Sequence, residues 1–208
     1  MTTPLGTLEI IERGPRSVTV RRQTRETEIS IALELDGRGD ANVDTGIRFY
    51  DHLLTSLGHH GLFDLTIRAK GDVDVDEHHT VEDVALVLGS AFNEALGDRA
   101  GIQRFGHASV PMDESLATAV VDVGGRAYSV LDLGFCGERV GGLPLQLVDH
   151  ALDSFSRTAR ATLHVSGTGR NDHHLAEAAF KALGRALRVA CEPDPRRSAV
   201  ASTKGTLA

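Results

Sequence analysis

Apolar and polar residues alternate in the early part of the chain as they do in half-buried strands. Residues 17–35 hold two such runs, and in the second run Ile29 and Ile31 fall on one face. Residues 46–61 change to helical spacing and end in glycines, which predicts a helix with a defined stop. A strand over residues 62–71 and an amphipathic helix over residues 81–96 complete this half.

The second part of the chain repeats this order of patterns. Strands are predicted first, followed by a helix, another strand and a final helix, as in the first part. Each part therefore consists of strands, helix, strand and helix. The predicted strands cover residues 116–125, 127–134 and 161–167, and the predicted helices cover residues 145–159 and 173–190.

Two histidine motifs recur at matching places in the two parts. An Asp-His pair lies in the first predicted helix of each part, with the histidines at His52 and His150. A second motif opens the later helix of each part, DEHHTVE at residues 76–82 and NDHHLAE at residues 171–177. The single histidine precedes the histidine pair by 26 positions in one part and by 23 in the other. We infer an internal duplication that kept its functional residues.

The HHxxE motif at a helix start is suited to binding metal. His78 and Glu82 are four residues apart and project from one face, whereas His79 is rotated by ~100° toward a different centre. Two facing motifs, completed by the upstream histidines, would supply four protein ligands to each of two ions. An octahedral ion would keep two positions open for substrate or water. The predicted ligands are His52, His78, His79, Glu82, His150, His173, His174 and Glu177.

Two interpretations without metal compete with the metal site, namely that these residues are surface residues or that they cap helices. One histidine pair alone is usually surface or capping chemistry, and Asp76, Thr80, Asn171 and Asp172 could simply cap helices. Two copies at near-equal spacing favour metal binding instead. Ligand chemistry does not select among Zn, Ni, Fe, Co and Mn. The histidines outside the repeat are expected to be ordinary surface or core residues, namely His59, His60, His107 and His164.

Composition narrows the function classes. A net charge of −7 argues against nonspecific binding of nucleic acid, and 4% aromatic residues without Trp argue against a base-stacking surface. Cys136 and Cys191 form no CxxC motif, which fits a reducing cytoplasm without disulfides. We find no secretory signal and no apolar run long enough for a membrane span. A cytoplasmic enzyme without nucleic-acid or membrane partners is expected.

Ten segments from about residue 17 onward form a pattern that covers nearly the whole chain. They are RQTRET (22–27), FYDHLL (49–54), HGLFDL (60–65), DEHHTVED (76–83), RFG (104–106), PMDE (111–114), GGR (124–126), VDH (148–150), NDHHLAE (171–177) and STKG (202–205). With these segments the chain resembles the imidazoleglycerol-phosphate dehydratase family. His59 stands where the family often has a basic residue, and Ala201 replaces a usual proline; neither is a predicted ligand.

The resemblance implies an α+β fold of two similar halves, with four helices packed between two outer four-stranded sheets. It implies two Mn²⁺ per subunit at the predicted ligands, and homo-oligomers of 24 subunits with active sites between subunits. The implied halves are residues 17–103 and 104–196. Residues 1–16 would form an N-terminal extension that can be flexible. Residues 197–208 would form a C-terminal tail that contacts phosphate.

The resemblance also implies individual roles. Glu26 matches an active-site carboxylate, and Glu82 and Glu177 would join it in acid–base steps. Without the family, Glu26 would be taken for a solvated charge and the Ser202-Thr203-Lys204 turn for a disordered tail. The implied substrate contacts are Glu26, His52, His78, Arg104, Arg126, His174, Ser202, Thr203 and Lys204.

The expected reaction is the metal-dependent dehydration of D-erythro-imidazoleglycerol phosphate to imidazole acetol phosphate and water, a step of histidine biosynthesis. Two other functions are considered. A dinuclear metallohydrolase acting on a phosphate ester also uses His and carboxylate ligands, but no HxD or GDxHG pattern is present. A metal-storage protein could also assemble through His-rich sites. Turnover of imidazoleglycerol phosphate by the metallated protein would separate the three.

Overall fold

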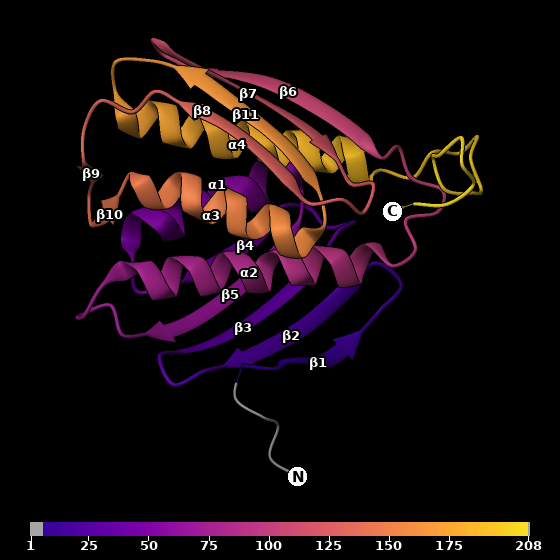
Figure 1. Ribbon diagram of the computed structural model, residues 1–208, viewed down its shortest axis with the longest axis horizontal. Coiled ribbons are helices and arrows are strands. Elements are labelled where there is room, and N and C mark those ends of the chain that lie inside the picture. Colours follow the sequence, from indigo (N-terminus) through magenta and orange to yellow (C-terminus); the bar gives the residue numbers. More distant parts are fainter. Residues whose placement is uncertain (1–5, 208) are drawn as a thin grey trace.

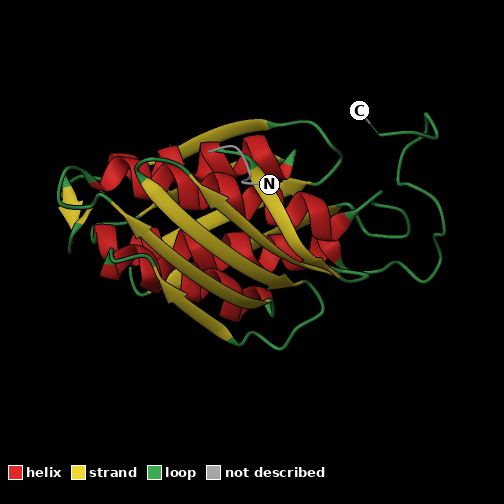
Figure 2. Cartoon of the chain, turned by 90° about the horizontal axis from the view of Figure 1, so that it is seen from below, coloured by secondary structure: helices red, strands yellow, loops and turns green. Residues whose placement is uncertain are grey.

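Two β-sheets enclose a layer of four helices (Figure 1). The computed structural model describes residues 6–207. Viewed from below, the strands of one sheet lie across the helices that they cover (Figure 2). In the central strand of the first sheet, Thr27–Glu34, every second side chain is buried, because one face of the sheet packs on the helices. The expected α+β architecture is confirmed.

The order of elements repeats. The first half contains β2 (Ser17–Gln23), β3 (Thr27–Glu34), β4 (Ala41–Asp44), α1 (Arg48–Gly61), β5 (Asp64–Gly71) and α2 (Glu77–Leu96). The second half contains β6 (Phe105–Met112), β7 (Ser115–Asp122), β8 (Tyr128–Leu133), α3 (Gln146–Ala159), β11 (Thr162–Thr168) and α4 (Asp172–Cys191).

The two sheets share one topology, which supports the duplication. The order β2-β3-β5-β4 in one sheet corresponds to β6-β7-β11-β8 in the other. In each sheet the last pair is parallel and the other pairs are antiparallel. The matching helices have equal lengths, 14 residues for α1 and α3 and 20 residues for α2 and α4.

The sequence pattern missed several short or exposed strands. Strand β1 (Leu8–Arg13) pairs with β2 and gives the first sheet five strands rather than four. It lies within the expected N-terminal extension, of which residues 1–5 are outside the described residues. Its side chains are almost all exposed, so no buried face marks it in the sequence. The short β4 and the mixed pattern of β6 hid those strands, and β9 (Arg139–Val140) and β10 (Leu143–Pro144) form a small hairpin.

Each helix of one half packs on a helix of the other half. Helix α1 packs on α4, and α3 packs on α2. Gly89 in α2 and Gly184 in α4 occupy equivalent positions at these contacts. A Cβ on either would lie 2.4 Å from a carbonyl oxygen of the facing helix, that of Phe155 or of Leu57. The duplicated glycines therefore allow both helix pairs to approach closely.

The helices are amphipathic, and none within residues 6–207 is both long and apolar enough to cross a bilayer.

Candidate active site

Polar side chains cap the two long helices next to their histidines. The Asp76 side chain accepts a hydrogen bond from the backbone N–H of His78 at 2.9 Å, and the Asn171 side chain accepts one from His173 at 3.0 Å. The capping role weighed for these residues is therefore real. It does not compete with metal binding, because the cap uses backbone N–H groups and leaves the imidazoles free.

The first cluster of donors joins α1 to α4. His52 Nε2 lies 2.9 Å from Glu177 Oε2, and His173 Nε2 lies 3.2 Å from the same oxygen. The three donor atoms lie within 4.8 Å of one another. Phe49 covers one side of this cluster, with its ring centroid 4.9 Å from that of His173.

The second cluster is its duplicate and joins α3 to α2. It consists of His78, Glu82 and His150, again with donor atoms within 4.8 Å of one another. His150 Nε2 lies 3.4 Å from Glu82 Oε1. That nitrogen is buried and has no hydrogen-bond partner among residues 6–207, an arrangement that is costly unless a ligand completes it.

Two predicted ligands remain outside both clusters. His79 and His174 are the third residues of α2 and α4, and their rings turn away from their histidine neighbours, at 77° between ring planes for His79 and 88° for His174. His79 Nδ1 lies 3.0 Å from Asp72, and His174 Nδ1 lies 2.9 Å from Glu114. These hydrogen bonds raise the pKa of both imidazoles, against a smaller lowering by burial.

The cluster on α4 is more buried and carries an additional cation. The Glu177 side chain is 10% exposed, against 35% for Glu82. Lys181 lies one turn further along α4, and its Nζ contacts the second oxygen of Glu177 at 2.7 Å. Burial alone would raise the pKa of the Glu177 carboxyl, but the hydrogen bonds from His52 and Lys181 outweigh it and lower that pKa to about 2. Glu177 is thus held as a carboxylate.

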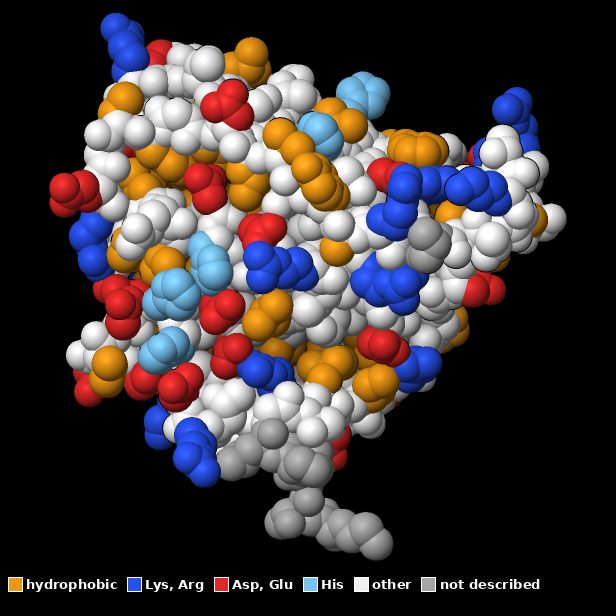
Figure 3. All heavy atoms as spheres, viewed as in Figure 1, with side chains coloured by type: hydrophobic (Ala, Val, Ile, Leu, Met, Phe, Trp, Pro, Cys, Tyr) orange, Lys and Arg blue, Asp and Glu red, His pale blue; other side chains and the backbone are white. Residues whose placement is uncertain are grey.

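The donor sets fit a divalent transition-metal ion. Each cluster combines two imidazole nitrogens with one carboxylate, and the measured separations of 2.9–3.4 Å join atoms that would share the ion. Donors about 2.1 Å from one ion and at right angles to each other lie about 3 Å apart. Three donors leave further positions for a fourth protein ligand and for substrate. In Figure 3, histidine side chains gather on the left among acidic ones, which is consistent with a cationic ligand.

The predicted phosphate contacts line a different pocket. This open pocket of about 370 Å³ lies between the start of β6 and the C-terminal turn, and Arg104, Arg126 and residues 201–204 line it. β-Bridges join Ala100 to Val200 and Ile102 to Pro193, so the segment that leads to this turn contacts the body of the protein. Arg126 is exposed, whereas other groups already hold the Arg104 guanidinium.

Arg104 anchors the walls of this pocket. Its guanidinium binds both oxygens of Asp122, at 2.7 and 2.9 Å, and donates to the carbonyl oxygen of Ala201 at 2.6 Å. The pairing with Asp122 raises the pKa of Arg104 further. The structure therefore gives Arg104 a role in holding the C-terminal turn, and its predicted contact with phosphate stays a prediction.

The histidine clusters and this pocket lie at opposite ends of the helices. The backbone N–H of Arg104 donates to Ala190 near the end of α4, whereas His173 and His174 lie in its first turn. At 1.5 Å per residue, the interval from His174 to Ala190 measures roughly 24 Å. Figure 1 shows the same separation, with the helix starts on the left and the C-terminal segment on the right. Glu26, at the start of β3, belongs to the histidine end, with its Oε2 3.9 Å from His79 Nδ1.

Comparison with known proteins decides the family. A profile of the imidazoleglycerol-phosphate dehydratase family matches residues 45–187. The chain belongs to this family. An imidazoleglycerol-phosphate dehydratase of Methanocella arvoryzae is 52% identical over 92% of this chain and its own entire length. One of Salinibacter ruber is 53% identical, covering 94% of this chain and 97% of that protein.

Solved structures of the family have the same fold. The imidazoleglycerol-phosphate dehydratase of Pyrococcus furiosus, in complex with (S)-C348, superimposes with a TM-score of 0.78 at 35% identity, covering 90% of this chain and 99% of that one. The enzyme of Staphylococcus aureus subsp. aureus N315 gives 0.76 at 34% identity, covering 84% and 98%. The predicted family and its lyase class are confirmed.

Several residues of this dehydratase-family site escaped the sequence reasoning. Lys181 could have been found, because it follows Glu177 by one helical turn. Asp72 and Glu114 could not, since only the fold brings them to His79 and His174. Phe49 looked like an ordinary core residue at helical spacing.

Proposed function

We propose that this protein is a metal-dependent dehydratase that converts D-erythro-imidazoleglycerol phosphate to imidazole acetol phosphate and water in histidine biosynthesis, in the cytoplasm. Membership of the family supports the reaction. The observation that carries metal dependence is the pair of duplicated clusters, each with two imidazoles and a carboxylate within 4.8 Å. The buried Nε2 of His150, which forms no hydrogen bond among the described residues, also supports it.

The proposed cofactor is two Mn²⁺ per chain. His52, His173 and Glu177 would hold one ion, and His78, Glu82 and His150 would hold the other. Imidazole and carboxylate donors also suit other first-row ions, so the choice of manganese rests on the family resemblance. Bound at these clusters, the ions would act as Lewis acids toward the imidazole and hydroxyl groups of the substrate.

Glu26 is the proposed acid–base residue. Its side chain is 55% exposed and lies at the histidine end, next to His79. An exposed carboxylate can accept the proton from C2 of a bound substrate while the C3 hydroxyl leaves as water, provided that the substrate sits within hydrogen-bonding reach. Glu82 and Glu177 remain candidates for the later transfer of a proton to C3, when the enol becomes the ketone. The hydrogen bonds that keep Glu177 ionised favour a ligand role for it.

A complete active site requires a second subunit. A substrate with an imidazole on a three-carbon phosphate chain spans roughly 10 Å at most. The histidine clusters and the pocket of Arg126 and Lys204 lie too far apart in one chain to share it. We therefore infer that a neighbouring copy supplies the phosphate contacts, and that His79 and His174 complete clusters of neighbouring copies. In a closed assembly of 24 subunits, as the resemblance implies, every copy would have a neighbour that supplies these contacts and ligands.

The phosphate would bind at the C-terminal turn. Ser202 and Thr203 offer hydroxyl groups, and Lys204 and Arg126 offer exposed positive charges around the pocket. The backbone N–H of Lys204 donates a hydrogen bond to Ser202 Oγ at 3.2 Å, which closes a tight turn. Charge-assisted hydrogen bonds of this kind hold a phosphate and fix the distance to the reacting carbons.

The test is turnover of imidazoleglycerol phosphate by protein loaded with Mn²⁺, followed through formation of the ketone product. We expect turnover in the loaded protein and its loss on chelation. Release of inorganic phosphate instead of the ketone would identify a metallohydrolase. Binding of metal without any turnover would identify a storage protein.

A further inference from the structure

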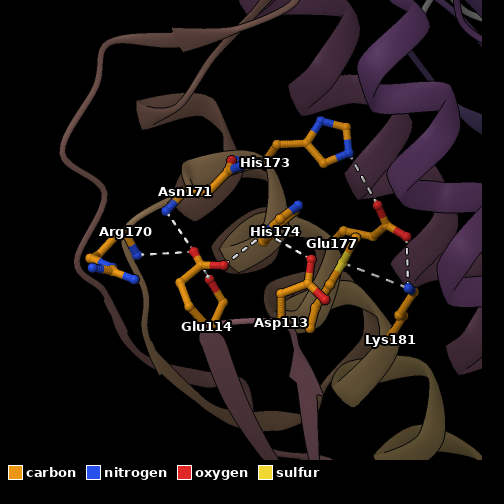
Figure 4. Close-up of polar contacts among 10 residues, drawn as sticks. Asp113, Glu114, Arg170, Asn171, His173, His174, Glu177 and Lys181 are labelled. Atoms are coloured by element: carbon orange, nitrogen blue, oxygen red, sulfur yellow. Dashed lines mark hydrogen bonds and ion pairs between the residues drawn. The ribbon is translucent and has the colours of Figure 1, made fainter.

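The two histidines outside the clusters are held by carboxylates in the same way. His174 Nδ1 lies 2.9 Å from Glu114 Oε2, and His79 Nδ1 lies 3.0 Å from Asp72 Oδ2. In the close-up of Figure 4, dashed lines join the Glu114 carboxylate to the His174 ring and to Arg170 and Asn171, the two residues before α4. A carboxylate accepts hydrogen bonds, so the proton of a neutral imidazole is placed on Nδ1 and the lone pair on Nε2.

We propose that Glu114 and Asp72 are positioning residues that set the ring orientation and tautomer of His174 and His79, so that each Nε2 can bind the metal ion of a neighbouring subunit. The inference rests on the proposed metal-dependent function. The inference also gives a role to His79 and His174, the two predicted ligands that lie outside both clusters of one chain.

Glu114 is the counterpart of Glu26 in the duplicated fold. Strands β3 and β7 have eight residues each and begin at Thr27 and Ser115, directly after these two glutamates. The same ancestral position thus holds a carboxylate in both halves. Glu26 Oε2, however, lies 3.9 Å from His79 Nδ1, beyond hydrogen-bonding distance, and its side chain is 55% exposed, whereas that of Glu114 is 24% exposed.

The loops after β5 and β11 explain this divergence. Asp72 directly follows β5 and occupies Nδ1 of His79, so Glu26 stays free. The position that corresponds to Asp72, counted from the first residue of each strand, is Arg170, which has no carboxylate to offer. Glu114 fills that place and holds the loop as well. Its Oε1 accepts from the backbone N–H groups of Arg170 and Asn171, at 3.2 and 2.9 Å, and from Ser115 Oγ at 3.0 Å.

One half therefore uses its glutamate for chemistry and the other uses it to orient a ligand. This division predicts that Glu114→Gln weakens metal binding, whereas Glu26→Gln leaves metal binding unchanged. In Glu114→Gln, the amide oxygen can keep the bonds from the loop N–H groups, which turns the amide NH₂ toward His174. That donor requires a lone pair on Nδ1 and puts the proton on Nε2, where it blocks metal binding.

The experiment compares Mn²⁺ titrations by calorimetry for wild type, Glu114→Gln, Glu26→Gln and Asp113→Asn. Asp113 is the matched control, since it lies in the same turn with its carboxylate 80% exposed and 3.9 Å from the same Nδ1. We expect Glu114→Gln to weaken Mn²⁺ binding ~10–100-fold, as loss of an outer-sphere partner does. The other two variants should bind like wild type. Imidazole ¹⁵N shifts of metal-free Glu114→Gln should show the Nε2–H tautomer at His174.

The outcomes separate the two levels of the proposal. Failure of wild type to bind Mn²⁺ would overturn the proposed function. Wild-type affinity and an unchanged tautomer in Glu114→Gln would overturn the positioning role. Asp72→Asn serves as the second variant if Glu114→Gln lowers the melting temperature, because the Asp72 carboxylate bonds His79 alone among the described residues. It should weaken Mn²⁺ binding by a similar factor.

Discussion

His52 Nε2 lies 2.9 Å from Glu177 Oε2, although the two residues belong to different halves of the duplicated chain. The equivalent contact of the other cluster joins His150 Nε2 to Glu82 Oε1 at 3.4 Å. Each cluster thus takes one histidine from one half and an HHxxE motif from the other. Each cluster therefore depends on both halves, and the crossed packing of α1 on α4 and of α3 on α2 brings its donors together.

His173→Ala should lower the metal content from two ions to one per chain and abolish turnover. The variant removes one donor of the α4 cluster and leaves the α2 cluster complete. Elemental analysis of purified protein measures this directly. His107→Ala is the control, since that histidine is exposed on β6 and belongs to neither cluster. Wild-type metal content in His173→Ala would contradict the assignment of the cluster.

Glu26→Gln should preserve folding and metal content but lower turnover by ~10²-fold or more, because it removes an acid–base group at constant shape. Glu28→Gln, two residues further along the chain in β3, removes an equal charge from a side chain that contacts Arg21 instead of a histidine. Steady-state kinetics on both variants would test the role. Equal turnover in both would show that Glu26 takes no part in the chemistry.

The six residues that the fold gathers into two clusters were all among the predicted ligands, but the sequence did not indicate which of them meet. Helical spacing places His78 and Glu82 on one face of a helix, and the repeat identifies their counterparts at His173 and Glu177. Spacing along one helix carries no information on which helix faces it. That His52 meets Glu177 depends on tertiary packing, in which Gly184 allows α1 to approach.

The strands were less predictable for a related reason. β3 shows a clear period of two because one face is buried, whereas β1 is exposed almost throughout and has no such signal. Likewise, Glu114 reaches His174 only because the turn between β6 and β7 lies beside the start of α4. Contacts between segments 60 residues apart leave no local pattern.

Gly184→Ala should destabilise the fold by ~1–3 kcal/mol through overpacking, and it should weaken metal binding at the α4 cluster. The new methyl group would lie 2.4 Å from the Leu57 carbonyl oxygen, which forces α1 and its His52 away from α4. Gly134→Ala is the matched control, as its Cβ would meet nothing within 4 Å. Thermal melts with and without Mn²⁺ measure both effects. Equal melting temperatures for the two variants would show that the helices can separate without cost.

Lys204→Ala and Arg126→Ala should raise KM strongly, since both remove exposed positive charges from the pocket at the C-terminal turn. Metal content should stay at the wild-type value, because the pocket and the clusters lie at opposite ends of α4. Arg157→Ala removes the same charge from a surface pair with Asp153 and serves as the control. An unchanged KM in both pocket variants would place the phosphate elsewhere.

Mild acid should release the metal. Ligand histidines must be neutral, and the carboxylates beside His79 and His174 raise the pKa of both, so protons compete with metal at a higher pH than for ordinary imidazoles. In the metal-free protein, the pH dependence of stability has the opposite sign. A raised folded-state pKa stabilises the protonated pairs below the unfolded value of about 6.5, and this stability is lost as pH rises through the folded value. Melting temperatures across that range, with and without Mn²⁺, should therefore show opposite slopes.

Assembly should also depend on metal. One chain supplies three donors to each cluster, while His79 and His174 lie outside both, and we propose that the fourth donor comes from a neighbouring copy. Metal binding then adds its free energy to the contact between subunits, and removal of the ion should weaken that contact. We expect chelation to convert a large oligomer into smaller ones, and Mn²⁺ at neutral pH to restore both size and activity.

Light scattering of chelated protein, after elemental analysis has shown that the metal is gone, measures the change in mass. Glu114→Gln provides an internal comparison, because it should shift the Mn²⁺ concentration at which the large form appears without altering the mass of the metal-free form. Glu26→Gln should assemble at the wild-type concentration, since Glu26 does not hold a ligand histidine. If the metal-free protein keeps its full mass at micromolar concentration, apolar contacts suffice for assembly, and the ions then serve catalysis alone.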